Sequence, residues 1–394
     1  MIIDQIREKA ELYFTEVLAI RRHIHANPEL SFQEYNTAKF ISDKLTAMGI
    51  SHTTGVAGTG VVAIIEGKNP GKKCVALRAD MDALPILEKN ETEYCSKNDG
   101  VMHACGHDVH SSCLLGAAHI LNDIKDSFEG TVKLIFQPGE EKHPGGASLM
   151  IKDGVLENPK PDAIFALHVY PHQVTGTLGF RAGQYMASAD EIYITIEGKG
   201  GHAALPHQTV DTIAIAALLI TGLQQVVSRK SNPLIPSVLT FGKIAGGFAT
   251  NVIPDKVEIL GTFRTMDETW RYQAHKWIKE FTQHTCEAYG AKVTIEIPSG
   301  YPSLFNDPSL TAKAEEWGRA YVGAENVHEL DLRMAGEDFS FYTHHVPGCF
   351  FRIGTSKGDK FTAPVHNPYF DIDEESMKTG MGMMAWCAVQ ELNS

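Results

Sequence analysis

The sequence predicts an α/β protein in which a larger domain with a mostly parallel central sheet is interrupted by a smaller α+β domain. First, a chain of 394 residues is too long to fold around one hydrophobic core. Second, strand patterns alternate with helical patterns before residue 184 and again after residue 300, as is typical of a parallel sheet. Third, the strand and helix patterns in residues 184–300 do not alternate in this way. We therefore expect the larger domain to comprise residues 1–183 and 301–394, and the inserted domain to comprise residues 184–300.

The first 49 residues predict two helices joined by the segment HANPELSFQE. Pro28 ends the first helix, because proline cannot continue it. Ser31 and Glu34 fit a capping box, in which each side chain would accept a hydrogen bond from the other's backbone N–H at the start of the second helix. Gly49 is expected to close that helix.

Apolar runs bounded by glycine predict the strands of the larger domain. They are GVVAIIEG at 60–67, KKCVALRADMDAL at 72–84, TVKLIFQPGEE at 131–141 and DAIFALHVY at 162–170, and a helical pattern occupies residues 111–124. In such sheets the binding and catalytic residues lie at the carboxyl ends of the strands. Polar residues that end these runs are therefore candidate site residues.

For the inserted domain, the sequence predicts elements in the order strand, helix, strand, strand, helix, strand. Its elements are an alternating strand from Glu191, an apolar helix from Val210 to about Val227, strands within 236–247 and 255–265, a helix through about Tyr289, and a strand within 291–301. This order is ferredoxin-like.

The composition excludes several classes of protein. Hydrophobic residues make up 43% and charged residues 21% of the chain, as in soluble globular proteins. The formal net charge of -13 argues against a nucleic-acid or anionic-membrane surface. We expect no signal peptide and no membrane span. Seven dispersed cysteines favour reduced thiols in a cytoplasmic protein.

Ligand-type residues recur where predicted strands end or loops begin. They are Asp80, Asp82, Cys105, His107, Glu140, Glu141, His168 and His366. Each residue alone has an ordinary structural explanation, but the strand ends of one sheet converge on one edge, so we expect the set to come together.

Metal chemistry accounts for this set. Thiolate, imidazole and carboxylate are ligands of Zn²⁺ or a neighbouring divalent transition metal. A thiolate such as Cys105 could bridge two ions, and the tandem Glu140-Glu141 fits one carboxylate on a metal beside another free for proton transfer. A structural zinc site is the alternative, but the sequence has no CxxC unit, and the acidic candidates favour an open, catalytic site.

Nine motifs, in order and together, resemble the M20 metallopeptidase clan, and within it the amidohydrolase branch of hippurate, N-acyl-amino-acid and indole-acetyl-amino-acid hydrolases. The resemblance covers roughly residues 20 to 385. The motifs are HANPELSFQE, RADMDALP, MHACGHDVH, QPGEE, GKGGHAALPH, TNVIPD, GTFR, GEDFSFY and VHNPYFDIDEES.

The resemblance implies two divalent metal ions and a catalytic glutamate. It implies that the ligands are Cys105, His107, Glu141, His168 and His366. Glu140 resembles the general base that activates water and then protonates the leaving amine. Asp82 corresponds to a residue that orients a ligating side chain, with a turn-capping role as the alternative. We expect zinc, with manganese, cobalt or nickel as other possibilities, and we leave His103 and His110 outside the ligand set.

By the same resemblance the inserted domain is a lid and a dimerisation domain, so a homodimer is expected. His202, Asn251 and Arg264 resemble its substrate-facing residues. A histidine or asparagine could donate to an oxyanion, and an arginine could bind a carboxylate. A turn for Asn251 and a surface ion pair for Arg264 are the alternatives. Gly336 resembles a loop glycine that lets backbone approach the substrate.

Two departures from the family pattern affect the site. Relatives commonly continue the tandem glutamate with glycine, whereas Lys142, His143 and Pro144 follow it here, so His143 could shape the pocket. Older clan members carry a histidine where this chain has Asp80, which puts a ligand role for Asp80 in doubt.

The expected function is metal-dependent hydrolysis of the amide bond in N-acyl amino acids. A dipeptidase or carboxypeptidase acting through the same metal site is the alternative, although no group for a free α-amino end is recognisable. A non-catalytic small-molecule binder of the same fold is the third hypothesis, and the presence of Glu140 with all five ligands counts against it.

Overall fold

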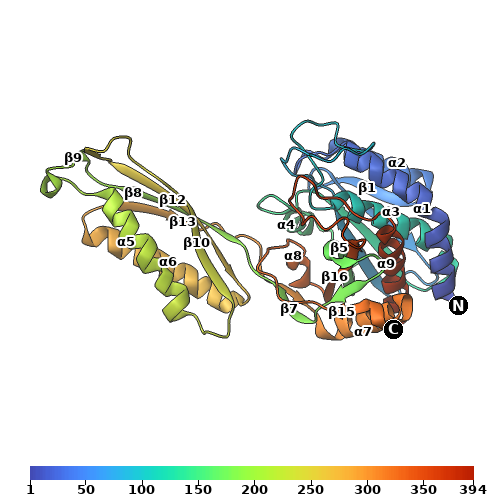
Figure 1. Ribbon diagram of the computed structural model, residues 1–394. Coiled ribbons are helices and arrows are strands. Elements are labelled where there is room, and N and C mark those ends of the chain that lie inside the picture. The colour runs from blue at the N-terminus through green and yellow to red at the C-terminus, as the bar shows by residue number, and fades with distance from the viewer. The chain divides into compact units, whose positions relative to one another are not determined.

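The computed structural model describes all residues, 1–394, and the chain divides into two compact units (Figure 1). The first unit comprises 1–183, 305–331 and 338–394, and the second comprises 184–304 and 332–337. Residues 301–304 and 332–337 thus group with the second unit, whereas the sequence pattern placed them in the larger domain. Backbone hydrogen bonds account for this difference, because Ala189 N–H donates to the Tyr301 carbonyl (2.9 Å) and Ala187 N–H donates to the Arg333 carbonyl (3.0 Å).

An eight-stranded sheet forms the centre of the first unit, in the order β1-β2-β4-β3-β5-β16-β6-β15. The run β4-β3-β5-β16 is parallel, as predicted, and antiparallel pairs join β1, β2 and β4 at one side. The strands are β1 (Ser51–Val56), β2 (Gly60–Glu66), β3 (Cys74–Asp80), β4 (Thr131–Gln137), β5 (Ala163–Val174), β6 (Leu178–Phe180), β15 (Val327–Glu329) and β16 (Gly348–Ser356).

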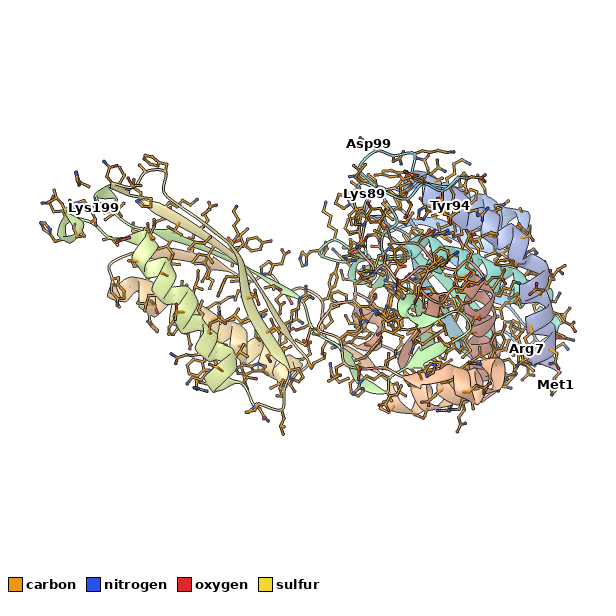
Figure 2. The ribbon with its side chains drawn as sticks, viewed as in Figure 1. Met1, Arg7, Lys89, Tyr94, Asp99 and Lys199 are labelled. Atoms are coloured by element: carbon orange, nitrogen blue, oxygen red, sulfur yellow. The ribbon has the colours of Figure 1, made fainter.

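Helices cover this sheet and build its hydrophobic core. They are α1 (Ile2–Ala26), α2 (Tyr35–Ala47), α3 (His107–Asp123), α4 (Gly146–Lys152), α7 (Pro308–Val322), α8 (Ser340–Thr343) and α9 (Ser376–Leu392). The helices α1, α3 and α9 pack on one another, and α3 and α9 also pack on the sheet. Arg7, near Met1 at the outer end of α1 (Figure 2), donates to the carbonyls of Ala320 and Tyr321 and so fixes α1 to the end of α7.

The capping box predicted before α2 is wrong. The Ser31 hydroxyl donates instead to Asp82 (2.6 Å), and the Glu34 carboxylate accepts no hydrogen bond from the first turn of α2. The Glu29 carboxylate takes that place, since it accepts from the backbone N–H of Thr37 (2.8 Å). Ser31 and Glu34 are therefore released for contacts with segments distant in the sequence.

The second unit is an antiparallel sheet in the order β10-β12-β8-β13, with α5 and α6 on one face (Figure 1). Its elements are β8 (Asp190–Glu197), β9 (Gly201–His202), α5 (Thr212–Gln225), β10 (Ser237–Ala245), β11 (Val252–Ile253), β12 (Lys256–Thr265), α6 (Glu268–Ala288) and β13 (Lys292–Glu296). Numbered along the chain, the four main strands follow the order 2-3-1-4, which is the ferredoxin-like arrangement predicted. Short strands β7 (Gly183–Met186) and β14 (Leu304–Asn306) pair where the chain enters and leaves this unit.

One helical stretch is long and apolar enough, by length and composition alone, to cross a membrane. It runs from Thr212 to Lys230 and has a mean hydropathy of 1.4 over its most apolar 18 residues. Ile215, Leu219 and Leu223 pack one side of this helix into the core of the second unit, which explains part of its apolar character.

Candidate metal centre

The predicted ligand residues of the first unit meet at the carboxyl edge of its parallel strands. Strands β3 and β4 run side by side and end in register at Asp80 and Gln137. Asp82 follows β3, the turn Pro138–Glu141 follows β4, and His168 lies on β5 beside them. The helix α3 begins at His107 at the same edge, four residues earlier than its apolar pattern predicted.

A first group of donors consists of Cys105, His107 and His168. One ligand atom from each lies within 4.8 Å of the other two, and all three residues are buried. The Cys105 Sγ and the His168 Nε2 are 3.5 Å apart. A thiolate and two imidazoles form a donor set suited to zinc or a similar divalent ion.

A second group consists of Cys105, Glu141 and His366, again with ligand atoms within 4.8 Å of one another. The His366 Nε2 lies 3.1 Å from the Glu141 Oε1, and the His366 side chain is 52% exposed. The backbone of His366 has a φ of 65°, an uncommon value for a residue other than glycine. Such strain is often stored at functional sites. Cys105 belongs to both groups, so its sulfur lies where one ligand could bridge two ions.

Hydrogen bonds orient the imidazoles so that one nitrogen of each faces the cluster. The His107 Nδ1 donates to the Asp82 Oδ1 (3.1 Å), and the His168 Nδ1 donates to the Val169 carbonyl (2.9 Å). The His107 Nε2 is left buried with no hydrogen-bond partner. Because a buried ring nitrogen needs a partner, this atom and the mixed donor set fit a pair of divalent metal ions.

Glu140 is buried beside these donors. Its Oε2 lies 4.0 Å from the His107 Nε2, and its Oε1 accepts a long hydrogen bond from the Asp338 N–H (3.4 Å). The two oxygens of Asp82 accept the backbone N–H groups of Glu140 (3.1 Å) and Glu141 (3.0 Å). Asp82 therefore holds both glutamates and one imidazole, which is more than the orienting role the sequence suggested for it.

Asp80 and His110 lie near His107, but their polar atoms already have partners. The Asp80 oxygens accept from the His110 Nδ1 and the Arg78 guanidinium, each at 2.6 Å. The His110 Nε2 accepts from the Val169 N–H (3.0 Å), and burial lowers the pKa of His110, so the ring is neutral. Asp80, His107 and His110 also form a buried group with ligand atoms within 4.8 Å of one another, but these hydrogen bonds already engage both Asp80 oxygens and both His110 nitrogens.

His103, which the sequence pattern also left outside the ligand set, is fully buried. Neither of its ring nitrogens has a hydrogen-bond partner, and burial lowers its pKa to about 4. No donor group contains it.

The electrostatics of the cluster favour replacing protons with a cation. Burial and the neighbouring Glu141 raise the pKa of the Cys105 thiol. Hydrogen bonds to Cys105 and Glu141 raise the pKa of His366 to about 10. Burial holds the pKa of His168 well below its usual value, so its ring is neutral, and its Nε2 faces the Cys105 sulfur. Metal binding would thus displace protons from Cys105 and His366.

The four residues predicted to face the substrate form two pairs within the second unit. His202 on β9 lies opposite Val252 on β11, and the Ala203 N–H donates to the Asn251 carbonyl (3.0 Å). A β-carbon on Gly336 would lie 3.5 Å from the Arg264 Nη1, at the other end of β12.

These pairs are separated by the length of β12. Eight residue steps of extended strand lie between Lys256 and Arg264, a length of about 26 Å. His202 and Asn251 are exposed, whereas Arg264 and Gly336 are half-buried. His143, next to the tandem glutamates, is exposed.

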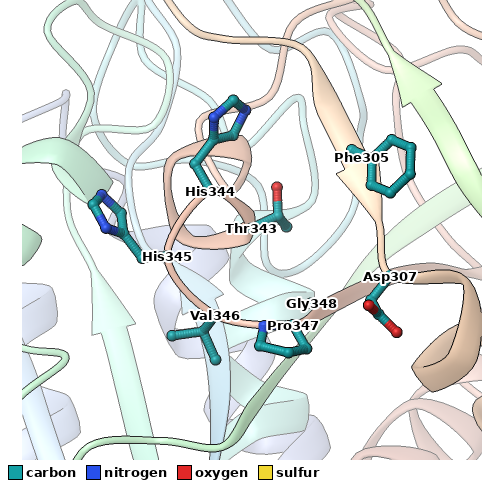
Figure 3. Close-up of a pocket in the computed structure, with 8 residues that line it drawn as sticks. All are labelled: Phe305, Asp307, Thr343, His344, His345, Val346, Pro347 and Gly348. Atoms are coloured by element: carbon teal, nitrogen blue, oxygen red, sulfur yellow. The ribbon is translucent and has the colours of Figure 1, made fainter.

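A separate cavity of about 290 Å³ lies at the start of α7 (Figure 3). Its lining includes His344 and His345, whose rings point in different directions, and Asp307, which caps α7 by accepting from the Leu310 N–H (2.8 Å). None of the residues lining it belongs to the donor groups. The candidate site is therefore the strand edge and not this cavity.

Comparison with known proteins places this site in a wide group of hydrolases. Residues 76–389 match the peptidase family M20/M25/M40. An N-acyl-L-amino acid amidohydrolase of Geobacillus stearothermophilus is 44% identical over 306 residues, which are 78% of this chain and 82% of that protein. An N-acetyl-L-cysteine deacetylase of Bacillus subtilis is 43% identical, over 92% of this chain and 85% of the relative.

Thermostable carboxypeptidase 2 of Saccharolobus solfataricus is 37% identical, over 100% of this chain and 99% of the relative. Among solved structures, the YXEP protein of Bacillus subtilis, described as a dinuclear metal binding peptidase of the M20 family, superposes with a TM-score of 0.82. It shares 34% identity, over 97% of this chain and 99% of that one.

Proposed function

The chain belongs to the peptidase family M20/M25/M40 and is a metal-dependent hydrolase of amide bonds, and from this premise we propose that its substrates are N-acyl amino acids. The observation that carries the proposal is the position of Glu140, buried beside two donor groups that share Cys105. A carboxylate next to a cluster of metal ligands is placed to transfer protons during hydrolysis.

We assign the ligands to the two groups described above, with zinc as the native metal because thiolate and imidazole favour it. Two divalent ions would supply Lewis-acid polarisation of the amide carbonyl and make water a stronger nucleophile at neutral pH. Glu140 removes a proton from the attacking water and delivers it to the leaving amine nitrogen. Asp82 keeps the Glu140 and Glu141 backbone and the His107 ring in place throughout.

Arg264 is the proposed receptor for the carboxylate of the amino-acid half. Burial lowers its pKa, and its one hydrogen bond is a long contact from Nη1 to the Met334 carbonyl (3.4 Å). A half-buried guanidinium without a carboxylate partner is suited to bind a carboxylate ligand in the two-pronged geometry that arginine favours. Gly336 beside it leaves room that a side chain would occupy.

We further propose a homodimer formed through the second unit, in the cytoplasm. Its edge strand β10 and the outer side of α5 expose apolar side chains: Ile213, Leu218, Val238 and Ile244. Exposed apolar surface beside an unpaired strand edge is typical of an interface. The separation of His202 and Asn251 from Arg264 supports a role for that pair in the site of the partner subunit. All seven cysteines are free, as expected in a reducing compartment.

The substrate proposal is tested by amine release from a panel of N-acyl amino acids and dipeptides. The protein is first stripped of metal and then resupplied with zinc, manganese, cobalt or nickel. We expect metal-dependent release from acyl amino acids and at least tenfold slower release from the same compounds with the carboxylate amidated. Faster cleavage of dipeptides or peptide carboxyl ends would favour the carboxypeptidase alternative. Metal uptake without any release would favour a binding protein.

The dimer is tested by light scattering and by mixing two variants. Glu140→Gln removes the proposed general base of its own chain, and His202→Ala removes a side chain of the second unit. If His202 acts in the partner's site, each variant alone has low activity and the mixture regains part of it. A monomer in solution, or a mixture no more active than its components, would contradict this assignment.

A further inference from the structure

The turn that carries the catalytic glutamate is held by two buried carboxylates. Three consecutive backbone N–H groups, those of Gly139, Glu140 and Glu141, point at them. Asp82 accepts the second and third, and Glu34 accepts the first through its Oε1 (2.8 Å). Glu34 belongs to none of the donor groups and comes from the segment between α1 and α2, about a hundred residues earlier in the chain.

Burial and hydrogen bonds hold the Glu34 side chain against this turn. Its side chain is fully buried, its Oε1 also accepts the Phe32 N–H (2.9 Å), and its Oε2 accepts the Thr59 hydroxyl (2.7 Å). Burying a carboxylate is costly unless it is hydrogen-bonded, and bonds from N–H groups to a charged acceptor are strong. The carboxylate is therefore a firm anchor for the Gly139 backbone.

The neighbouring Phe32 fits the same turn. Its backbone has a φ of 65°, and its ring covers Gly139, so that a β-carbon at position 139 would collide with the ring. Gly139 itself has a φ of 60°, a conformation that favours glycine. The Phe32 ring and the Glu34 carboxylate thus both contact Gly139, the residue immediately before Glu140.

We propose that Glu34 is a positioning residue for the general base: it fixes the Gly139 backbone so that the Glu140 carboxylate is aimed at the reacting water. The inference rests on the proposed function, in which Glu140 transfers the proton. Asp82 holds the far side of the turn, and Glu34 holds the near side. Loss of Glu34 frees the peptide before Glu140 while leaving all five metal ligands and Asp82 in place.

Three variants separate positioning from a merely structural role. Glu34→Ala removes the acceptor for Gly139. Glu34→Gln can keep it, because its amide oxygen can accept from Gly139 and Phe32 while its NH2 donates to Thr59. Thr59→Val removes one hydrogen bond of the same carboxylate but leaves the Gly139 contact, so it is the matched control for loss of a buried hydrogen bond.

We expect kcat to fall by about tenfold to a hundredfold in Glu34→Ala, since small misplacements of a catalytic group have effects of this size. KM and the number of metal ions bound are expected to stay within about twofold, and Glu34→Gln and Thr59→Val to keep kcat within about threefold of the parent. Hydrogen exchange of a peptide covering residues 138–142, in the metal-loaded protein, is expected to speed up in Glu34→Ala and not in Thr59→Val.

Unchanged exchange of this peptide in Glu34→Ala, or an unchanged kcat per metal-loaded chain, would overturn the inference. Equal losses of kcat in Glu34→Ala and Thr59→Val would also overturn it, because they would indicate general destabilisation. If Glu34→Ala does not fold, Glu34→Asp, which withdraws the acceptor by one methylene, is measured in the same way. If the parent protein hydrolyses no amide at all, the proposed function fails, and the exchange measurement alone decides whether Glu34 fixes the turn.

Discussion

The metal centre of the first unit and the substrate-facing residues of the second unit were both expected from motifs, yet they differ in burial and in hydrogen bonding. In the first unit the side chains are mostly buried, and His107 and His168 are each oriented by a hydrogen bond from the second ring nitrogen. In the second unit His202 and Asn251 are exposed and lie a strand's length from Arg264. The polar cluster of the first unit is thus buried among its hydrogen-bond partners, whereas His202 and Asn251 of the second unit face solvent.

The largest expected effect comes from removing the residue that both donor groups share. Cys105→Ala takes a ligand from each group, so we expect metal uptake to fall below two ions per chain. Loss of the charge stabilisation that an ion supplies lowers the rate by roughly a thousandfold or more. Metal analysis of the dialysed variant, together with amine release, checks this. Full retention of two tightly bound ions would show that Cys105 is not a ligand.

Asp82→Asn tests whether the residue that hydrogen-bonds the ligands matters more for metal binding than a residue that only lies close to them. We expect metal affinity to fall by about tenfold to a hundredfold, as is usual when a group that orients a ligating histidine is altered. Asp80→Asn is the control, because the Asp80 oxygens contact His110 and Arg78 and not the backbone of the tandem glutamates. Competition with a chelator measures both variants, and a larger loss in Asp80→Asn would reverse the roles assigned here.

Arg264→Gln probes the second unit. The variant loses the charge proposed to bind the substrate carboxylate, so KM for an acyl amino acid is expected to rise by roughly tenfold to a hundredfold. The metal content stays unchanged. An amidated substrate, which lacks the carboxylate, provides the control and is expected to be insensitive to the substitution. Equal effects on both substrates would assign Arg264 a structural role.

Metal binding is expected to depend on pH with a definite sign. The pKa of Cys105 is raised above 9.0, and that of His366 is raised to about 10, so both groups carry protons in the metal-free protein at neutral pH. A cation must displace these protons, and raising the pH therefore strengthens binding, by up to about tenfold per pH unit for each proton released. Calorimetry in buffers of different ionisation enthalpy counts these protons. Binding that is independent of pH between 6 and 8 would contradict the assigned ligands.

Much of the first unit could be predicted because apolar runs and polar strand ends carry direct information about a parallel sheet. The strands β3, β4 and β5 and the residues that follow them lie where the pattern placed them. The predicted capping box failed because local spacing cannot reveal a competing partner: Glu29 caps α2, and Ser31 bonds to Asp82.

Contacts that join distant segments were beyond the reach of sequence patterns. Nothing near Glu34 in the sequence indicates that its partner is Gly139, and nothing near residues 332–337 indicates their backbone hydrogen bonds to the second unit. The doubt about Asp80 could be resolved only by seeing both of its oxygens occupied.

The central claim is that Glu140 transfers protons beside a metal pair that other residues hold. The most direct test is the rate of amine release by Glu140→Gln, measured on protein whose metal content is determined in the same sample. The account predicts two ions per chain, as in the parent, and a rate lower by about a hundredfold to ten-thousandfold. Two bound ions with an undiminished rate would contradict it, because some other group would then be moving the proton.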